Sequence, residues 1–172
     1  EECLNVLNID ENWILGRATP DVSAFLHDSS ANPEVVNHLA SAYEVKSILL
    51  KRSGVNPKRY RLFAFKFFVC IQAFGSVVRT GLDAAQDMLD MRDFKAARTM
   101  VGRNIIPLIQ QTELLGELMS ARSFYAVIQA YCRDFETAHR EMASLAPFRA
   151  GFTVEQREEY DFQCQLIRDI QA

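Results

Sequence analysis

The longest apolar pattern in the chain runs from Asn56 to Gly81 and predicts one central helix. Asn56 is suited to capping the start of this helix, and Pro57 fits its first turn, where a missing N–H costs nothing. Gly81 can adopt the left-handed conformation that ends a helix. The alternative is that Gly75 and Gly81 only bend a longer helix, whose pattern continues as far as Met91. Apolar residues cover most of the circumference, with one stripe made of Phe63, Phe67, Cys70, Phe74 and Val77. A helix that is apolar on all sides is buried or covered by a partner.

A second long pattern begins at Ser123 and stops before Pro147. Its apolar positions alternate steps of four and three residues without a break, at Phe124, Ile128, Tyr131, Phe135, Ala138, Met142 and Leu145. This heptad spacing is typical of a helix that packs at a shallow angle on a neighbour. We therefore expect one uninterrupted helix here, packed near the central one.

Capping signals mark the other elements. A short apolar segment that includes Trp13 comes first, and Met88 to Ala97 resembles a helical hairpin. Further helices are predicted to start at Thr19, Asn32, Asp93, Asn104 and Thr153. We find no fixed repeat of 20 to 50 residues and no period-two alternation of the kind that marks a strand. The prediction is an all-α fold: one globular domain over residues 1–172, an irregular bundle of seven to eight helices around the central Phe-rich helix.

Composition narrows the class of protein. At 172 residues, with 49% hydrophobic and 24% charged residues, the chain can bury a full core without disulfides or metals. A formal net charge of −3 favours neither nucleic acid nor an acidic membrane surface. The four cysteines form no CxxC pair and are expected to be buried, reduced thiols, which indicates an intracellular protein, cytoplasmic or nuclear. No leader or membrane-spanning stretch is evident, and we expect the chain to be a fragment of a longer protein.

Catalytic and metal-binding patterns are weak. Glu136 and His139 have the E-x-x-H spacing of di-metal bundles, but no second pair accompanies them. Cys132 and His139 are two helical turns apart, about 10 Å, which is too far for a nucleophile and its base. The common phosphate, zinc-protease and hydrolase motifs are missing. We therefore expect no enzyme activity, no cofactor, no metal and no small-molecule substrate.

One basic cluster stands out, in the turn before the central helix. Its cations and one aromatic ring could hold a phosphate backbone and stack on a base. The alternative interpretation is a solvated turn whose first two cations interact with the end of the preceding helix. The candidate residues for nucleic acid, RNA or DNA, or another polyanion are Lys51, Arg52, Lys58, Arg59, Tyr60 and Arg61.

The predicted helices carry more apolar surface than a small bundle easily covers. Apolar surface that stays exposed in this way usually forms a protein interface, often a symmetric one. The leading hypothesis is a protein–protein interaction or homodimerisation domain of an intracellular scaffold or regulatory protein, whose partner is itself or another helical protein. The candidate interface residues are Phe124, Tyr125, Ile128, Tyr131, Phe162 and Leu166.

Overall fold

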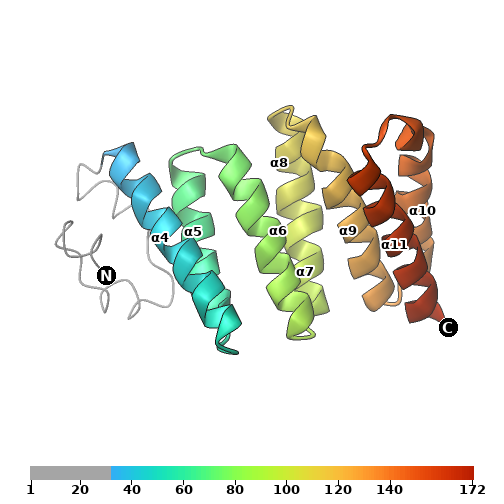
Figure 1. The fold of residues 1–172 in the computed structure, drawn as a ribbon, viewed down its shortest axis with the longest axis horizontal. Coiled ribbons are helices and arrows are strands. Elements are labelled where there is room, and N and C mark those ends of the chain that lie inside the picture. The colour runs from blue at the N-terminus through green and yellow to red at the C-terminus, as the bar shows by residue number, and fades with distance from the viewer. Residues whose placement is uncertain (1–31) are drawn as a thin grey trace. The chain divides into compact units, whose positions relative to one another are not determined.

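The computed structural model describes residues 32–172, and all regular structure in this range is helical (Figure 1). One continuous helix is made up of α7 (Phe94–Thr99), the π-helical segment Met100–Ile105 and α8 (Ile106–Gln111). Counted in this way, the described residues form seven helices. The predicted all-α fold of seven to eight helices is confirmed. The segment that contains Trp13 and the helix expected from Thr19 lie outside the described residues.

The chain divides into two compact units, Glu1–Thr80 and Gly81–Ala172. Their boundary falls inside α6, which spans Phe74–Asp90. The expectation of a single domain over residues 1–172 stays a prediction.

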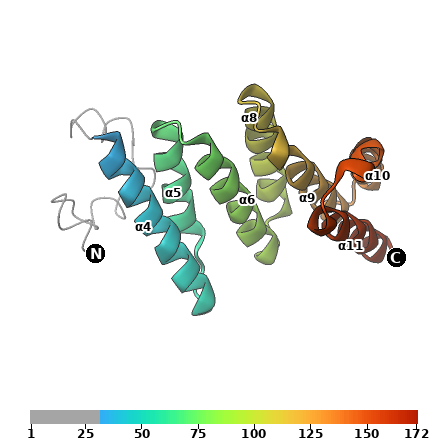
Figure 2. The same cartoon turned by 45° about the horizontal axis from the view of Figure 1, so that its top comes forward.

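In the first unit, α4 (Pro33–Arg52) lies beside α5 (Lys58–Cys70), as both ribbon views show (Figures 1 and 2). Asn32 caps α4, as expected, because its side-chain oxygen accepts from the Glu34 amide at 3.0 Å. The core between the two helices is aromatic. The ring of Tyr43 lies 5.9 Å from that of Phe67 and 5.7 Å from that of Phe63, measured between centroids.

The second unit is arranged around α9 (Leu118–Tyr131), which packs against α10 (Phe135–Leu145) and α11 (Val154–Gln171). Before α9 come α7 (Phe94–Thr99), the π-helical segment Met100–Ile105, α8 (Ile106–Gln111) and the short 3-10 helix Leu115–Glu117. A second 3-10 helix, Ala146–Gly151, joins α10 to α11. The predicted capping box of Thr153 and Gln156 begins α11. The Tyr160 hydroxyl, on α11, donates to the Met142 carbonyl at 3.1 Å and joins α11 to α10.

The central Phe-rich helix is shorter than predicted. It ends at Cys70, and a turn over residues 71–73 separates it from α6. Gln72 takes the left-handed conformation at φ 55°, and the Ala73 amide donates to the Phe68 carbonyl at 3.0 Å. This is the Schellman arrangement that closes a helix, built here without glycine. Gly81, which was expected to end the helix, lies inside α6 instead.

The prediction of one uninterrupted heptad helix is also wrong. The apolar pattern from Phe124 to Leu145 is divided between α9 and α10 by a turn in which Arg133 has φ 63° and Asp134 caps the next helix. The two halves of the pattern pack against each other. The sequence pattern predicted an apolar surface that requires a partner. Much of that surface is therefore covered within the unit.

The turns reveal a repeat that the sequence analysis missed. Left-handed residues occur at Gln72, Arg92, Glu113 and Arg133, at intervals of 20, 21 and 20 residues. The segment Arg-Asp-Phe-x-x-Ala occurs at both the second and the fourth of these turns, and in both the Asp caps the following helix. A helical hairpin of about 41 residues recurring in this way is typical of helical-repeat proteins. The hairpin expected at Met88 to Ala97 is confirmed, since α6 ends and α7 begins within it.

No helix starts at Asn104. The helix from Asp93 continues through Gly102 and Asn104 as a π-helical segment and runs into α8. Pro107 explains this irregularity, because it cannot donate to the carbonyl four residues earlier, at Arg103, and its ring crowds that carbonyl. The wider π turn accommodates the proline without ending the helix.

Within residues 32–172, no helix combines the length and apolar character needed to cross a membrane.

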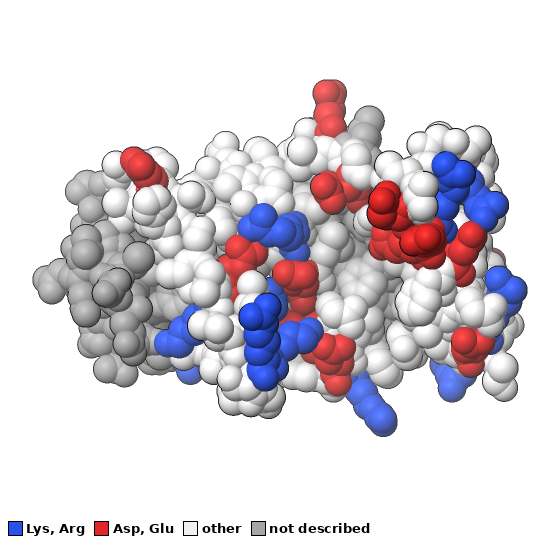
Figure 3. Space-filling view, viewed as in Figure 1, with Lys and Arg blue, Asp and Glu red and all other residues white. Residues whose placement is uncertain are grey.

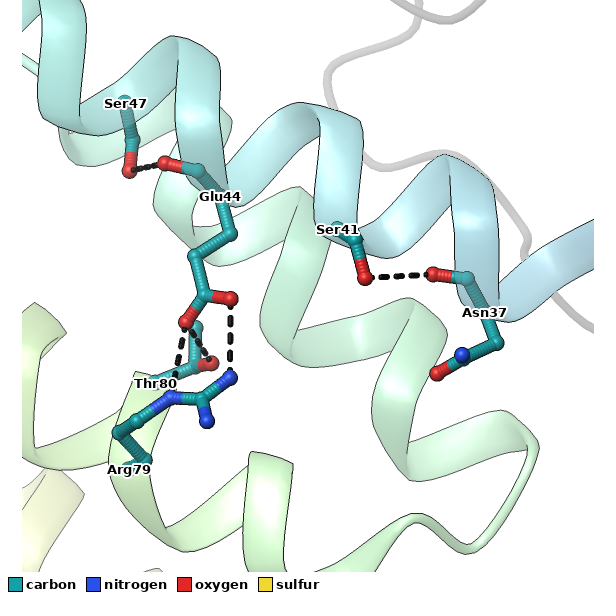
Figure 4. Close-up of polar contacts among 6 residues, drawn as sticks. All are labelled: Asn37, Ser41, Glu44, Ser47, Arg79 and Thr80. Carbon is teal, nitrogen blue, oxygen red and sulfur yellow. Dashed lines mark hydrogen bonds and ion pairs between the residues drawn. The ribbon is translucent and has the colours of Figure 1, made fainter. Parts of the chain in front are cut away.

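A charged contact joins α6 to α4 in the first unit (Figure 4). The Glu44 carboxylate accepts from Arg79 Nε and Nη2, at 3.2 and 2.9 Å, and from the Thr80 hydroxyl at 3.1 Å. The side chain of Glu44 is 13% exposed and that of Arg79 is 61% exposed. Because the carboxylate is the more buried partner, its loss leaves a buried hydroxyl without its acceptor.

We expect Glu44→Ala to lower the free energy of unfolding by about 1–2 kcal/mol, and Arg79→Ala to lower it by less than about 1 kcal/mol. Urea unfolding followed by circular dichroism measures both changes. Glu136→Ala is the control, because its carboxylate is 92% exposed and lies 4.0 Å from Arg140. Equal stability of the Glu44 and Glu136 variants would contradict the proposed contribution of this contact.

Candidate functional site

Four of the six predicted interface residues line one groove in the second unit, which we call the apolar groove. They are Phe124 and Tyr131 of α9 and Phe162 and Leu166 of α11. The end of α6 and the start of α7 complete the walls, and the groove has a volume of about 450 Å³. The sequence placed these residues on two helices, and packing of α11 on α9 brings them together.

Aromatic contacts shape the apolar groove. Phe94 stacks on Tyr131 with ring centroids 5.2 Å apart and an interplanar angle of 12°. Both of these rings are half-buried, and so are the side chains of Phe124 and Leu166. Phe162, by contrast, is 65% exposed. An exposed phenylalanine beside a concave aromatic surface is suited to contact with an apolar side chain from another molecule.

Polar groups in the apolar groove are few. The Gln163 side chain is 8% exposed, and its amide nitrogen donates to Glu159 at 3.1 Å. Its side-chain oxygen has no hydrogen-bond partner among the residues that the structure describes. A buried acceptor of this kind costs free energy until a donor reaches it. At the rim, Gln86 donates to the Asp90 carboxylate at 2.8 Å.

The other two predicted interface residues lie elsewhere. Ile128 is fully buried and contributes to the core of the second unit, so it is not accessible to a partner. Tyr125 is half-buried and lines a separate pocket of about 300 Å³. The apolar groove and this pocket use different faces of α9, because consecutive residues of a helix point about 100° apart.

The pocket around Tyr125, which we call the cationic pocket, was not predicted. Its walls are Lys95, Arg98, Thr99 and Arg103 from the helix that begins at Phe94, and Tyr125 and Gln129 from α9. Burial raises the pKa of Tyr125, while Arg98 is the strongest influence that opposes this shift. A hydrogen bond donated by Gln129 also lowers the pKa of Tyr125, by less than Arg98 does. The spacing of the three cations along one helix was the available sequence signal.

Gly102 allows Tyr125 to approach the π-helical segment. A Cβ atom added at Gly102 would lie 2.6 Å from Cε2 and 2.8 Å from Cζ of the Tyr125 ring. No carbon of a real side chain fits at these distances. Glycine at this position therefore sets where the Tyr125 ring lies in the cationic pocket.

The basic cluster predicted to bind a polyanion is divided by the structure. Arg61 is buried, at 3% exposure, whereas Lys51, Arg52 and Arg59 are exposed and Lys58 is half-buried. The ring of Tyr60 stacks on Tyr43 at 6.0 Å between centroids, and Lys46 Nζ lies 4.5 Å from its centre. Tyr60 and Arg61 thus take part in packing of the first unit, and polyanion binding by the exposed cations stays a prediction.

Charge on the drawn face of the molecule is mixed. Lys and Arg side chains lie among Asp and Glu side chains there, and acidic side chains gather over the start of α11 (Figure 3). The first turns of α11 contain Glu155, Glu158 and Glu159, where the positive end of the helix dipole favours carboxylates. Hydrogen bonds at the start of the helix lower the pKa of Glu155 accordingly. These acidic residues are therefore explained by the helix that carries them.

The weak catalytic candidates do not form a site. The exposed His139 lies 3.1 Å from Gln171 through Nε2, and Glu136 points into solvent near Arg140. Within residues 32–172, no group of three or more His, Cys, Asp or Glu side chains could hold a metal ion. Cys132 donates to the Phe94 carbonyl at 3.7 Å, and burial raises the pKa of its thiol. The three described cysteines are half-buried, rather than fully buried as expected.

Comparisons with protein-family models, with curated proteins and with solved structures find no match to this chain.

We expect Gly102→Ala to lower the free energy of unfolding by about 1–3 kcal/mol, because the added methyl group displaces the Tyr125 ring. Gly75→Ala is the control, since a Cβ added there would have no atom of another described residue within 4 Å, apart from its chain neighbours and the backbone of its own helix. That change is expected to be neutral or stabilising by up to about 1 kcal/mol. Chemical denaturation measures the free energy of unfolding of both variants. Equal values would show that the close approach of Tyr125 to Gly102 does not affect stability.

Stability is expected to fall in alkaline solution, because burial raises the pKa of both Tyr125 and Tyr160 above the ordinary value of 10.0. Their contribution is fully present below that ordinary value and is lost as the pH rises through the raised pKa values. Ionised Tyr160 also cannot donate to the Met142 carbonyl. We expect the free energy of unfolding to fall above about pH 10, and Tyr125→Phe with Tyr160→Phe to make the fall shallower. Urea unfolding from pH 7 upward tests this, and parallel curves would contradict it.

Proposed function

We propose that the protein is a non-catalytic interaction module whose apolar groove binds an amphipathic helix of a partner protein. The observation that carries this proposal is the exposure of Phe162 beside the half-buried rings of Phe124 and Tyr131. Burial of one such aromatic side chain by a partner contributes about 1.5–3 kcal/mol. A few buried aromatic anchors of this kind supply most of the binding energy at protein interfaces.

The two long walls of the groove favour a helical ligand. α9 contributes Phe124, Val127 and Tyr131 at spacings of three and four residues, and α11 contributes Phe162 and Leu166 four residues apart. Side chains at these spacings form straight rows along a helix. A third helix with apolar residues at similar spacing can lie along such rows, as in other helix-in-groove complexes.

Gln163 adds a polar requirement to the partner helix. Gln163 lines the apolar groove, and its buried side-chain oxygen has no hydrogen-bond partner among the described residues. This oxygen accepts a hydrogen bond from a donor on the ligand once the side chain turns toward the groove. Serine, asparagine, lysine or arginine among the apolar anchors of the partner would supply this donor. A fully apolar helix would leave the oxygen unpaired, so the groove should select against it.

Self-association is the second candidate, and it is supported by two further apolar side chains. Phe148 is 66% exposed and Val154 is 62% exposed, and both belong to the second unit. Insertion of Phe148 into the apolar groove of another copy would join different surfaces of the two chains. We also propose a reducing, intracellular setting, as expected for part of a scaffold or regulatory protein, which the free Cys132 and Cys164 support.

The partner hypothesis can be tested with helical peptides selected from a displayed library on the full chain. We expect Phe162→Asp to weaken binding of the selected peptides by at least about thirtyfold, the effect of losing one interface hot spot. Phe148→Asp is the matched control, because that side chain is as exposed as Phe162 but does not line the groove. Fluorescence anisotropy gives the affinities. Failure to select peptides that depend on Phe162 would overturn the proposal.

Light scattering coupled to size-exclusion chromatography separates the two candidates. A monomer at high micromolar concentration supports a separate partner protein and excludes self-association. A dimer that is lost in both the Phe162→Asp and Phe148→Asp variants supports self-association through the groove. A dimer that survives both changes would place the interface outside the apolar groove.

A further inference from the structure

The cationic pocket gathers positive charge on one side of a helix. Lys95, Arg98 and Arg103 line it, and no acidic residue does. None of the three forms an ion pair with another described residue. The first and last of them are eight positions apart, or about 12 Å along the helix, which is longer than a single phosphate group. Arginine binds phosphate oxygens through paired N–H groups, so this row is suited to a phosphate-bearing ligand.

A buried amide group in the same pocket shows that phosphate alone is an incomplete ligand. Gln129 is 3% exposed, and its side-chain oxygen has no hydrogen-bond partner within residues 32–172. This oxygen requires an N–H or O–H donor, which the oxygens of an ionised phosphate cannot supply. The ligand should therefore carry a donor close to its phosphate. The amino and imino groups of nucleic acid bases are donors of this kind.

Tyr125 adds an aromatic ring to the pocket that the cations and Gln129 line. The π-helical segment and Gly102 allow this ring to lie close to the cationic helix, at a position that no larger residue would permit. π-Helical turns occur frequently at functional sites. An aromatic ring beside cations is the usual arrangement for holding an unpaired base, because every base has a face that can stack.

We propose that the cationic pocket binds a nucleotide, either free or as one unit of a single strand. Arg98 and Arg103 contact phosphate, Tyr125 stacks on the base and the Gln129 oxygen accepts from it. A phosphorylated peptide fits less well, because a phosphoserine side chain has neither a ring for Tyr125 nor the length to reach all three cations. This site lies on a different face of α9 from the apolar groove, and it is also distinct from the basic cluster at residues 51–61.

The test uses the full chain and a labelled single-stranded RNA of about ten nucleotides, with binding followed by fluorescence anisotropy. We expect Arg98→Gln with Arg103→Gln to weaken binding at least about tenfold. The slope of log K against log salt should fall by about 0.7 for each lost phosphate contact. Arg140→Gln with Arg168→Gln is the matched control, because both arginines are exposed and neither lines the pocket. That control should leave affinity and slope unchanged.

Gln129→Met tests recognition of the base separately from charge. It removes the unpaired acceptor, so the protein should unfold at the same or a higher temperature. The salt slope should stay as in the unchanged protein, while the differences in affinity among U, A, C and G homopolymers should shrink. Unchanged base preferences would overturn the assigned role of Gln129.

Competitors identify the form of the ligand. Displacement of the RNA by AMP or ATP supports a free nucleotide, and binding of the strand without such displacement supports single-stranded nucleic acid. Tighter binding of a phosphoserine peptide than of RNA would overturn the proposal. It would also be overturned by wild-type protein that binds none of these probes at about 100 μM. Equal binding by the Arg98/Arg103 and control variants would overturn it as well. Loss of binding only in Lys51→Gln with Arg52→Gln would move the site to the first unit.

Discussion

Left-handed turns decide how this chain folds. Each of five helix ends places one residue at positive φ and closes with a hydrogen bond from the next amide to a carbonyl five residues earlier. These bonds measure between 2.8 and 3.1 Å and are donated by Val55, Ala73, Asp93, Leu114 and Asp134. Left-handed backbone costs about 1–2 kcal/mol for a residue other than glycine, and the closing bonds and the packing of the returning helix offset that cost. The repeated turns limit the helices to one or two dozen residues.

These turns change the meaning of the apolar surface. A heptad pattern over two dozen residues on one straight helix would need a separate partner along its whole length. Once Arg133 reverses the chain, α10 covers much of α9, and α11 covers more of it. The apolar surface that stays open is confined to the groove beside Phe162. A small groove with one exposed anchor is suited to a single helix, whereas a continuous seam would be suited to a coiled-coil partner.

α9 contributes side chains to both candidate sites, because neighbouring residues on a helix point in different directions. Phe124 faces the apolar groove and Tyr125 faces the cationic pocket. In each site a glutamine oxygen is buried without a hydrogen-bond partner within residues 32–172, Gln163 in the first and Gln129 in the second. Folded proteins rarely leave buried polar atoms unpaired, and both proposals assign the missing donor to a ligand.

The sequence by itself determined the helical class, because apolar residues at spacings of three and four allow only helices to bury them. It also determined several helix starts, since Asn32, Asp93 and Thr153 cap their own helices through local hydrogen bonds. Only the tertiary structure decided where the long apolar patterns reverse, because four of the five left-handed positions within residues 32–172 carry Gln, Arg or Glu in place of the glycine that normally marks such turns. The two sites likewise depend on contacts between distant helices. Phe124 and Phe162 are 38 residues apart, and which side chains meet at that separation is set by packing rather than by spacing along the chain.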